Sequence, residues 1–150
     1  MICNLTKKTV ISSRTECAVG LWQRARGMIG RDFDCFDAMV FDHCSSIHTC
    51  FMSIPLDVIF VSRDHKILKT VRNLMPWRLF VCCKKAFYVI ELPSGTIERT
   101  RSACGDIVDL AAVMDAGTEK EFGSALLRRK AESAVRRAGI HSSSFGSFPC

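Results

Sequence analysis

Residues that could perform chemistry gather between positions 43 and 57. His43, Cys44, His48 and Cys50 lie within eight residues, and Asp57 follows in the next apolar run. Imidazole and thiolate groups are the usual ligands of zinc. A thiol beside an imidazole that a carboxylate orients can also act as a nucleophile. The stretch therefore suggests two kinds of site, a metal centre or a thiol active site.

A metal centre would depend on His48 and Cys50. In a strand these side chains share a face and lie about 6.6 Å apart along the chain, close enough to share one ion. The spacing of the His and Cys residues matches no standard zinc module. The competing interpretation is that Cys50 fills the core and His48 hydrogen-bonds a loop carbonyl. We expect no metal and no cofactor, and His48 and Cys50 are the candidates if an ion does bind.

A thiol enzyme would combine Cys50 with His48 or His43 and with Asp57. The residue types are present, but the sequence does not show whether they meet. For Asp57 there is a structural alternative, because a carboxylate entering an apolar strand often accepts backbone N–H bonds and fixes a loop. A metal- or thiol-dependent enzyme using His48, Cys50 and Asp57 is therefore the alternative function.

Arginine and tryptophan residues near glycines suggest a third kind of site. Arg24, Arg26 and Arg31 surround Gly27 and Gly30, and Trp77 precedes a further arginine. Such side chains can clamp a carboxylate, a phosphate or a sugar. Alternatively, the glycines end a helical turn and Trp77 closes one end of the fold. The ligand-binding candidates are His48, Asp57, Trp77, Arg78, Arg26 and Arg31.

These residues must be positioned by short strands. Turn-forming residues separate many brief apolar runs, a pattern typical of a β-sandwich or barrel. Leu56–Ser62 and Lys66–Val71, joined at Asp64–His65, predict a hairpin, and Thr96–Arg101 predicts a short helix after Pro93–Ser94–Gly95. The expected strands are residues 9–12, 16–18, 38–41, 47–52, 56–62, 66–71, 87–92 and 107–110.

The pattern changes near residue 116. Thr118 with Glu121 forms a capping box, and an apolar stripe at helical spacing follows it. We expect a compact β domain at residues 1–115, an amphipathic basic helix at 116–139 and a disordered tail at 140–150. The basic residues of that helix lie largely off its apolar stripe, as on a solvated face, so nucleic acid is not the expected partner.

Composition limits the class of protein. A chain of 150 residues with 24% charged residues favours one soluble domain. No apolar run approaches the roughly 20 residues of a membrane helix, and the N-terminus lacks a signal-peptide pattern. The nine cysteines include no CxxC pair, which indicates thiols in a reducing compartment. We expect a cytoplasmic protein.

Four blocks of the chain occur in the order of a known family. They are Arg26–Arg31 (RGMIGR), Ile54–Phe60 (IPLDVIF), Tyr88–Gly95 (YVIELPSG) and Gly105–Val108 (GDIV). Over residues 9–110 the chain resembles the domain of unknown function 192 family, in a subgroup with IHTxFM and PWR motifs. The resemblance implies a bacterial-type, jelly-roll-like β domain with no established activity, and relatives are often exported.

One departure from the family pattern affects the candidate site. The commoner pattern has a Trp-Met-Lys-Asn-Thr run before the IPLD block, where this chain has His48–Met52. Any role of that lysine or asparagine therefore does not transfer. We interpret the chain as a mainly β, jelly-roll-like sandwich or distorted barrel with a C-terminal helix. Its expected function is a non-enzymatic accessory or binding module.

The expected interaction surface lies near His48, Trp77 and the Arg24–Arg31 segment. Its partner would be a small anionic or carbohydrate-like ligand, or a protein.

Overall fold

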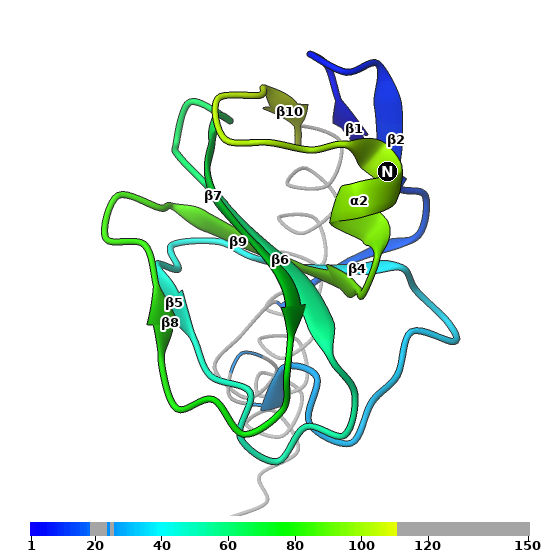
Figure 1. The fold of residues 1–150 in the computed structure, drawn as a ribbon, viewed down its shortest axis with the longest axis vertical. Coiled ribbons are helices and arrows are strands. Elements are labelled where there is room, and N and C mark those ends of the chain that lie inside the picture. The colour runs from blue at the N-terminus through cyan, green and yellow to red at the C-terminus, as the bar shows by residue number, and fades with distance from the viewer. Residues whose placement is uncertain (19–23, 25, 111–150) are drawn as a thin grey trace, which may run out of the picture. The chain divides into compact units, whose positions relative to one another are not determined.

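The computed structural model describes residues 1–18, 24 and 26–110 (Figure 1). Met1–Gly117 forms one compact unit, and its described part is mainly β. The predicted helix at 116–139 and tail at 140–150 lie outside the described residues, so those two predictions stay open.

The described part contains one short helix and ten strands, and the strands form three sheets. The first sheet, in the order β10-β1-β2, is formed by β1 (Ile2–Asn4), β2 (Thr9–Ser12) and β10 (Val108–Asp109). The second, in the order β3-β4-β9-β6-β7, is formed by β3 (Thr15–Cys17), β4 (Ala38–Phe41), β6 (Leu56–Val61), β7 (Ile67–Leu74) and β9 (Tyr88–Pro93). The third pairs β5 (Ser46–Ile47) with β8 (Val81–Cys82), and the helix is α2 (Thr96–Thr100).

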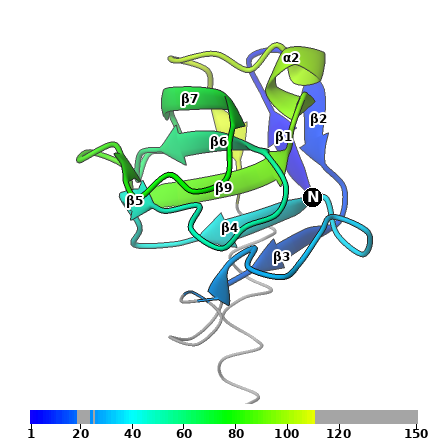
Figure 2. The same ribbon diagram turned by 60° about the horizontal axis from the view of Figure 1, so that its bottom comes forward.

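The five-stranded sheet carries a core on each face, as Figure 2 shows with β4, β9, β6 and β7 stacked in order. Strand β6 is buried at all six positions, and its side chains alternate between the two cores because successive strand residues point to opposite faces. Val58 and Phe60 belong to one apolar cluster, and Ile59 and Val61 to the other. A strand that is covered on both faces has a nearly continuous apolar sequence, as in LDVIFV.

Helix α2 is held to the sheet by a carboxylate from β6. Gly95 precedes the helix with φ 90° and supplies no side-chain cap. Asp57, 1% exposed, accepts the backbone N–H of Ile97 at 2.7 Å and that of Asn73 at 2.9 Å. Asp57 thus fixes both the start of α2 and the end of β7, the loop-fixing role that its sequence context allows.

The sequence predicted the main elements of the central sheet. The mainly β, sandwich-like class is confirmed, and strands at 38–41, 56–62, 66–71 and 87–92 correspond to β4, β6, β7 and β9 within two or three residues. The helix after Gly95 is also confirmed. Strands β1 and β8 were not predicted. The sheets of the described part stay open, so the barrel alternative does not hold.

The predicted strand at 47–52 is wrong. Strand β5 ends at Ile47, and the chain then turns, because the Thr49 carbonyl accepts the N–H of Met52 at 3.3 Å and that of Trp77 at 2.8 Å. Phe51 takes a left-handed φ of 63°. His48 and Cys50 therefore do not share the face of a strand.

Candidate functional site

A glutamate lies inside the central sheet with an unused oxygen. Glu91, on β9, is paired in register with Met39 of β4 and Val58 of β6, and it is 3% exposed. Its Oε2 has no hydrogen-bond partner among the described residues. Burial raises the pKa of Glu91 from 4.5 to about 8. At neutral pH the group is mostly a carboxylic acid, which can donate one hydrogen bond and accept others.

Glu91 lines a cavity of about 170 Å³. The inner walls are apolar, because Met28, Phe41 and Met52 are all buried. The outer lining includes Arg26 and His48, which are exposed. The lining thus contains both a buried acid, Glu91, and an exposed arginine, Arg26. Its described lining is Arg24, Arg26, Gly27, Met28, Ile29, Phe41, Cys44, Ser46, Ile47, His48, Met52 and Glu91.

Two arginines line the cavity, and only Arg24 has an acidic partner among the described residues. Nη1 of Arg24 lies 2.7 Å from Oδ1 of Asp42, and Oδ2 of the same carboxylate contacts Nδ1 of His43 at 3.0 Å. Arg26 forms no ion pair within the described residues, and its Nε donates only a long bond, 3.4 Å, to the carbonyl of Ile29. Arg26 is therefore the cation available to an incoming anion.

The RGMIGR block forms one wall of the cavity through two tight turns. The N–H of Ile29 bonds the carbonyl of Arg26 at 2.9 Å, and the N–H of Arg31 bonds that of Met28 at 3.1 Å. Gly27 and Gly30 have φ of 48° and 64°, a conformation that favours glycine. These two turns place the Met28 side chain in the interior and leave Arg26 at the surface.

Thr49 ties the loop that contributes His48 and Met52 to the cavity to the loop that carries Trp77. The Thr49 hydroxyl donates to the Met75 carbonyl at 2.8 Å and accepts the N–H of Arg78 at 2.9 Å. The N–H of Thr49 donates to the Arg78 carbonyl at 2.8 Å. One fully buried threonine thus joins the His48–Phe51 loop to the Met75–Arg78 loop.

The structure brings some predicted site residues to the cavity and places others elsewhere. Arg26 and His48 line it. Arg31 pairs with Glu16 at 2.8 Å and stacks over Phe36 at 4.6 Å. Asp57 is occupied by backbone N–H groups. Trp77 and Arg78 are exposed on a loop and do not line the cavity.

The geometry does not assemble the predicted thiol or metal site. No hydrogen bond joins His48 to Cys50 or Asp57 within the described part of the chain, and Sγ of Cys50 lies 3.9 Å from the Arg78 carbonyl. Across residues 1–18, 24 and 26–110, no three His, Cys, Asp or Glu side chains group so as to hold a metal ion.

Sequence reasoning missed Glu91, which lines the cavity, and Thr49, which holds the neighbouring loop in place. Glu91 had a usable signal, because it is the one charged residue inside the apolar run FYVIEL, and a charge in a buried strand requires an explanation. Thr49 had none, because its partners at positions 75 and 78 come from a distant segment.

The fold and the cavity together define the class of protein. It is a mainly β, sandwich-like domain with a buried acid and an arginine-lined cavity. The chain belongs to the DUF192 family, described as "Uncharacterized ACR, COG1430", whose family model matches residues 3–110. The resemblance seen in the four sequence blocks is thereby confirmed.

The chain is similar to a curated protein and to two solved structures. The chain is 32% identical over 115 residues to a UPF0127 protein of Thermococcus sibiricus, covering 73% of each chain. A solved protein of unknown function from Novosphingobium aromaticivorans is 24% identical at a TM-score of 0.57, over 63% of this chain and 73% of that one. A "putative transcription regulator" from Sinorhizobium meliloti is 26% identical at the same TM-score of 0.57, over 63% and 79%. The first structure supports the fold alone.

No helix in the described residues is long and apolar enough to cross a membrane.

Proposed function

We propose that this domain is a non-enzymatic binding module for a small organic anion. The observation that carries the proposal is the Glu91 carboxyl, which is buried, has a free Oε2 among the described residues, and lines the same cavity as Arg24 and Arg26. A buried polar atom without a partner costs about 1–3 kcal/mol. A ligand that supplies the missing hydrogen bond recovers that free energy.

The size of the cavity limits the ligand. Its volume is about 170 Å³, and an apolar cavity of about 150 Å³ holds one benzene molecule. A ring or short branched chain fits inside, whereas sites for larger ligands span roughly 300–1,000 Å³. Nucleotides and oligosaccharides are therefore disfavoured, and so is a single sugar, because the apolar walls offer few partners for its hydroxyls.

The charged and polar residues of the lining determine the orientation of the bound ligand. Arg26, exposed and without an ion pair in the described residues, attracts a carboxylate or phosphate at the opening. Glu91, at the buried end, favours a hydroxyl or carbonyl group. The ligand class is a small monoanion with an apolar middle and a hydrogen-bonding group at the far end.

Binding of 4-hydroxybenzoate tests this proposal, because the molecule has a carboxylate, a ring and a hydroxyl in that order. By calorimetry or NMR titration we expect 4-hydroxybenzoate to bind roughly tenfold more tightly than benzoate, since benzoate leaves Glu91 unpaired. Phenol, which lacks the carboxylate, should bind more weakly than 4-hydroxybenzoate.

Arginine variants provide the matched control. Arg26→Ala should weaken 4-hydroxybenzoate binding by about tenfold, the usual effect of a charge-assisted hydrogen bond. Arg31→Ala should leave it unchanged, because Arg31 pairs with Glu16 and lies outside the cavity lining. Equal affinity for all three probes, or equal loss in the two variants, would contradict the proposal.

A cytoplasmic location is part of the proposal. It is supported by the cysteines, because no disulfide joins those of the described residues, and thiols persist in reducing compartments. Cell fractionation with an antibody against the chain tests it, and recovery from an exported fraction would refute it.

A further inference from the structure

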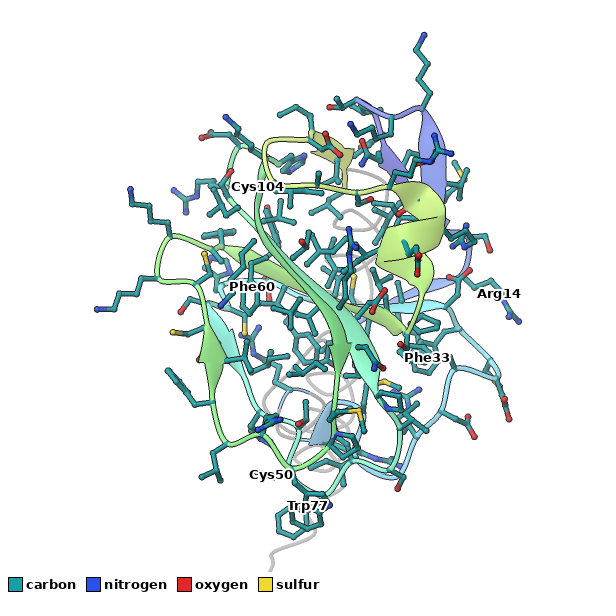
Figure 3. The ribbon with its side chains drawn as sticks, viewed as in Figure 1. Arg14, Phe33, Cys50, Phe60, Trp77 and Cys104 are labelled. Atoms are coloured by element: carbon teal, nitrogen blue, oxygen red, sulfur yellow. The ribbon has the colours of Figure 1, made fainter. Side chains whose placement is uncertain are left out.

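Five large apolar side chains are exposed on two neighbouring loops. Phe51 is 66% exposed, Trp77 64%, Leu79 81% and Phe80 69%, and Met75 is 50% exposed. We call Phe51, Met75, Trp77, Leu79 and Phe80 the aromatic tip. Figure 3 shows Trp77 projecting outward at one end of the described part, beside Cys50. None of the five lines the cavity described above.

The two loops are held in fixed positions. The rings of Phe51 and Trp77 stack edge to face with centroids 5.0 Å apart, and Thr49 bonds both loops. Phe51 and Trp77 have left-handed φ of 63° and 65°, which is unusual for bulky residues. Strained backbone positions of this kind cluster at functional sites, which indicates that the tip has a function.

The two segments that carry the tip contain no acidic residue. Residues 72–80 include Arg72 and Arg78, both exposed, and residues 47–56 contain neither Lys, Arg, Asp nor Glu. Exposed Trp, Phe and Leu side chains beside Arg are typical of segments that enter the headgroup region of an anionic bilayer.

We propose that the aromatic tip docks the domain on the surface of a membrane containing anionic lipid. The rings enter the boundary between headgroups and acyl chains, and Arg78 contacts the lipid phosphates. A lipid surface is favoured over a protein partner because the tip's loops carry Arg78 and no acidic residue, which matches the phosphates of an anionic bilayer. This docking is independent of the cavity and of its ligand.

Sedimentation with lipid vesicles tests the proposal on the full chain. We expect binding to vesicles of phosphatidylcholine mixed with phosphatidylglycerol, weak binding to phosphatidylcholine alone, and release by salt. Trp77→Ala should lower the partition coefficient by roughly tenfold, because an aromatic side chain leaves the interface. Arg78→Ala should lower it about fivefold.

Two further variants keep the result interpretable. Leu5→Ala changes another exposed apolar residue, 54% exposed, in the turn that follows β1. Figure 1 shows β1 at the opposite end of the described part from the end where Figure 3 labels Trp77. It should not alter vesicle binding. Trp77→Gly should fold, because a positive φ favours glycine, and should still lose binding.

The location of the contact is checked by fluorescence. Brominated lipid should quench tryptophan emission in the natural chain and much less in Trp77→Phe, which should still sediment with vesicles. Three outcomes would overturn the proposal: equal binding to neutral and anionic vesicles, binding unaffected by Trp77→Ala, or a concentration-dependent dimer that Trp77→Ala disperses. The last would assign the tip to a second copy of the chain.

Discussion

Two carboxylates of this domain differ in burial and in hydrogen bonding, and their pKa values shift in opposite directions. Desolvation alone raises the pKa of Asp37, but bonds from the Ser12 and Ser13 hydroxyls and from the Ser13 and Arg14 backbone lower it to about 2. Glu91 has no such donors within the described residues, and burial raises its pKa to about 8. Asp37 is therefore a fixed anion that holds a loop, whereas Glu91 stays mostly neutral and available to a ligand.

Replacing Glu91 by glutamine should remove a pH dependence of stability. The folded pKa of Glu91 is about 8 and its ordinary value 4.5, so its stabilising contribution is full below pH 4.5 and lost as pH rises through about 8. Gln cannot ionise. Relative to the natural chain, Glu91→Gln should gain about 3–5 kcal/mol across that window, measured by urea unfolding at several pH values.

Glu98→Gln is the control for this experiment, because Glu98 is exposed on α2. Its stability difference from the natural chain should not change with pH over the same window. A flat difference for Glu91→Gln as well would show that Glu91 ionises normally in the folded state.

At the scale of elements, α2 depends on a strand distant in sequence. The helix has five residues, which is too short to be stable in isolation, and Asp57 of β6 supplies the acceptor for its N-terminal Ile97. The helix in turn contributes Ile97 to the apolar cluster that contains Ile59 of β6. The sheet therefore positions the helix.

Substituting Asp57 by asparagine should loosen α2 and the end of β7 together. Each carboxylate oxygen accepts one backbone N–H, and an amide can present an oxygen to only one of them. We expect a loss of about 2–3 kcal/mol in unfolding free energy and faster hydrogen exchange at Ile97 and Asn73. Asp64→Asn, in the exposed hairpin turn, should change neither, and protection of Ile97 in Asp57→Asn would contradict this role.

At the scale of the whole molecule, we expect the β unit to fold as an independent domain. Met1–Gly117 forms one compact unit, and the central sheet carries an apolar cluster on each face. A chain of this length is long enough to form its own core. The boundary near residue 116 remains a sequence prediction.

Ending the chain at Gly117 tests that boundary. We expect the shortened protein to unfold cooperatively by circular dichroism, with a midpoint within a few degrees of the full chain, because both apolar clusters of the described residues are formed by positions up to Leu110. It should also bind 4-hydroxybenzoate as the full chain does. A broad, non-cooperative transition would show that residues 118–150 complete the domain.

The sequence by itself determined the family, the mainly β class and the elements around β6, because local patterns encode them. Strand β6 is a continuous apolar run, and Gly95 follows Pro93 in a turn that only a few residue types form. Arg26 and His48, which line the cavity, were among the predicted residues: Arg26 because it lies beside Gly27, and His48 because of its spacing from Cys50.

Only the tertiary structure decided which of these residues share a site. Glu91 lies beside the cavity because β9 is flanked by β4 and β6, a pairing that no local pattern specifies. The run His48–Met52 looked like a strand but turns at Thr49, whose partners Met75 and Arg78 come from a segment 26 to 29 residues away. Long-range hydrogen bonds and strand order arise from packing of the whole chain, so they overrode the local apolar signal.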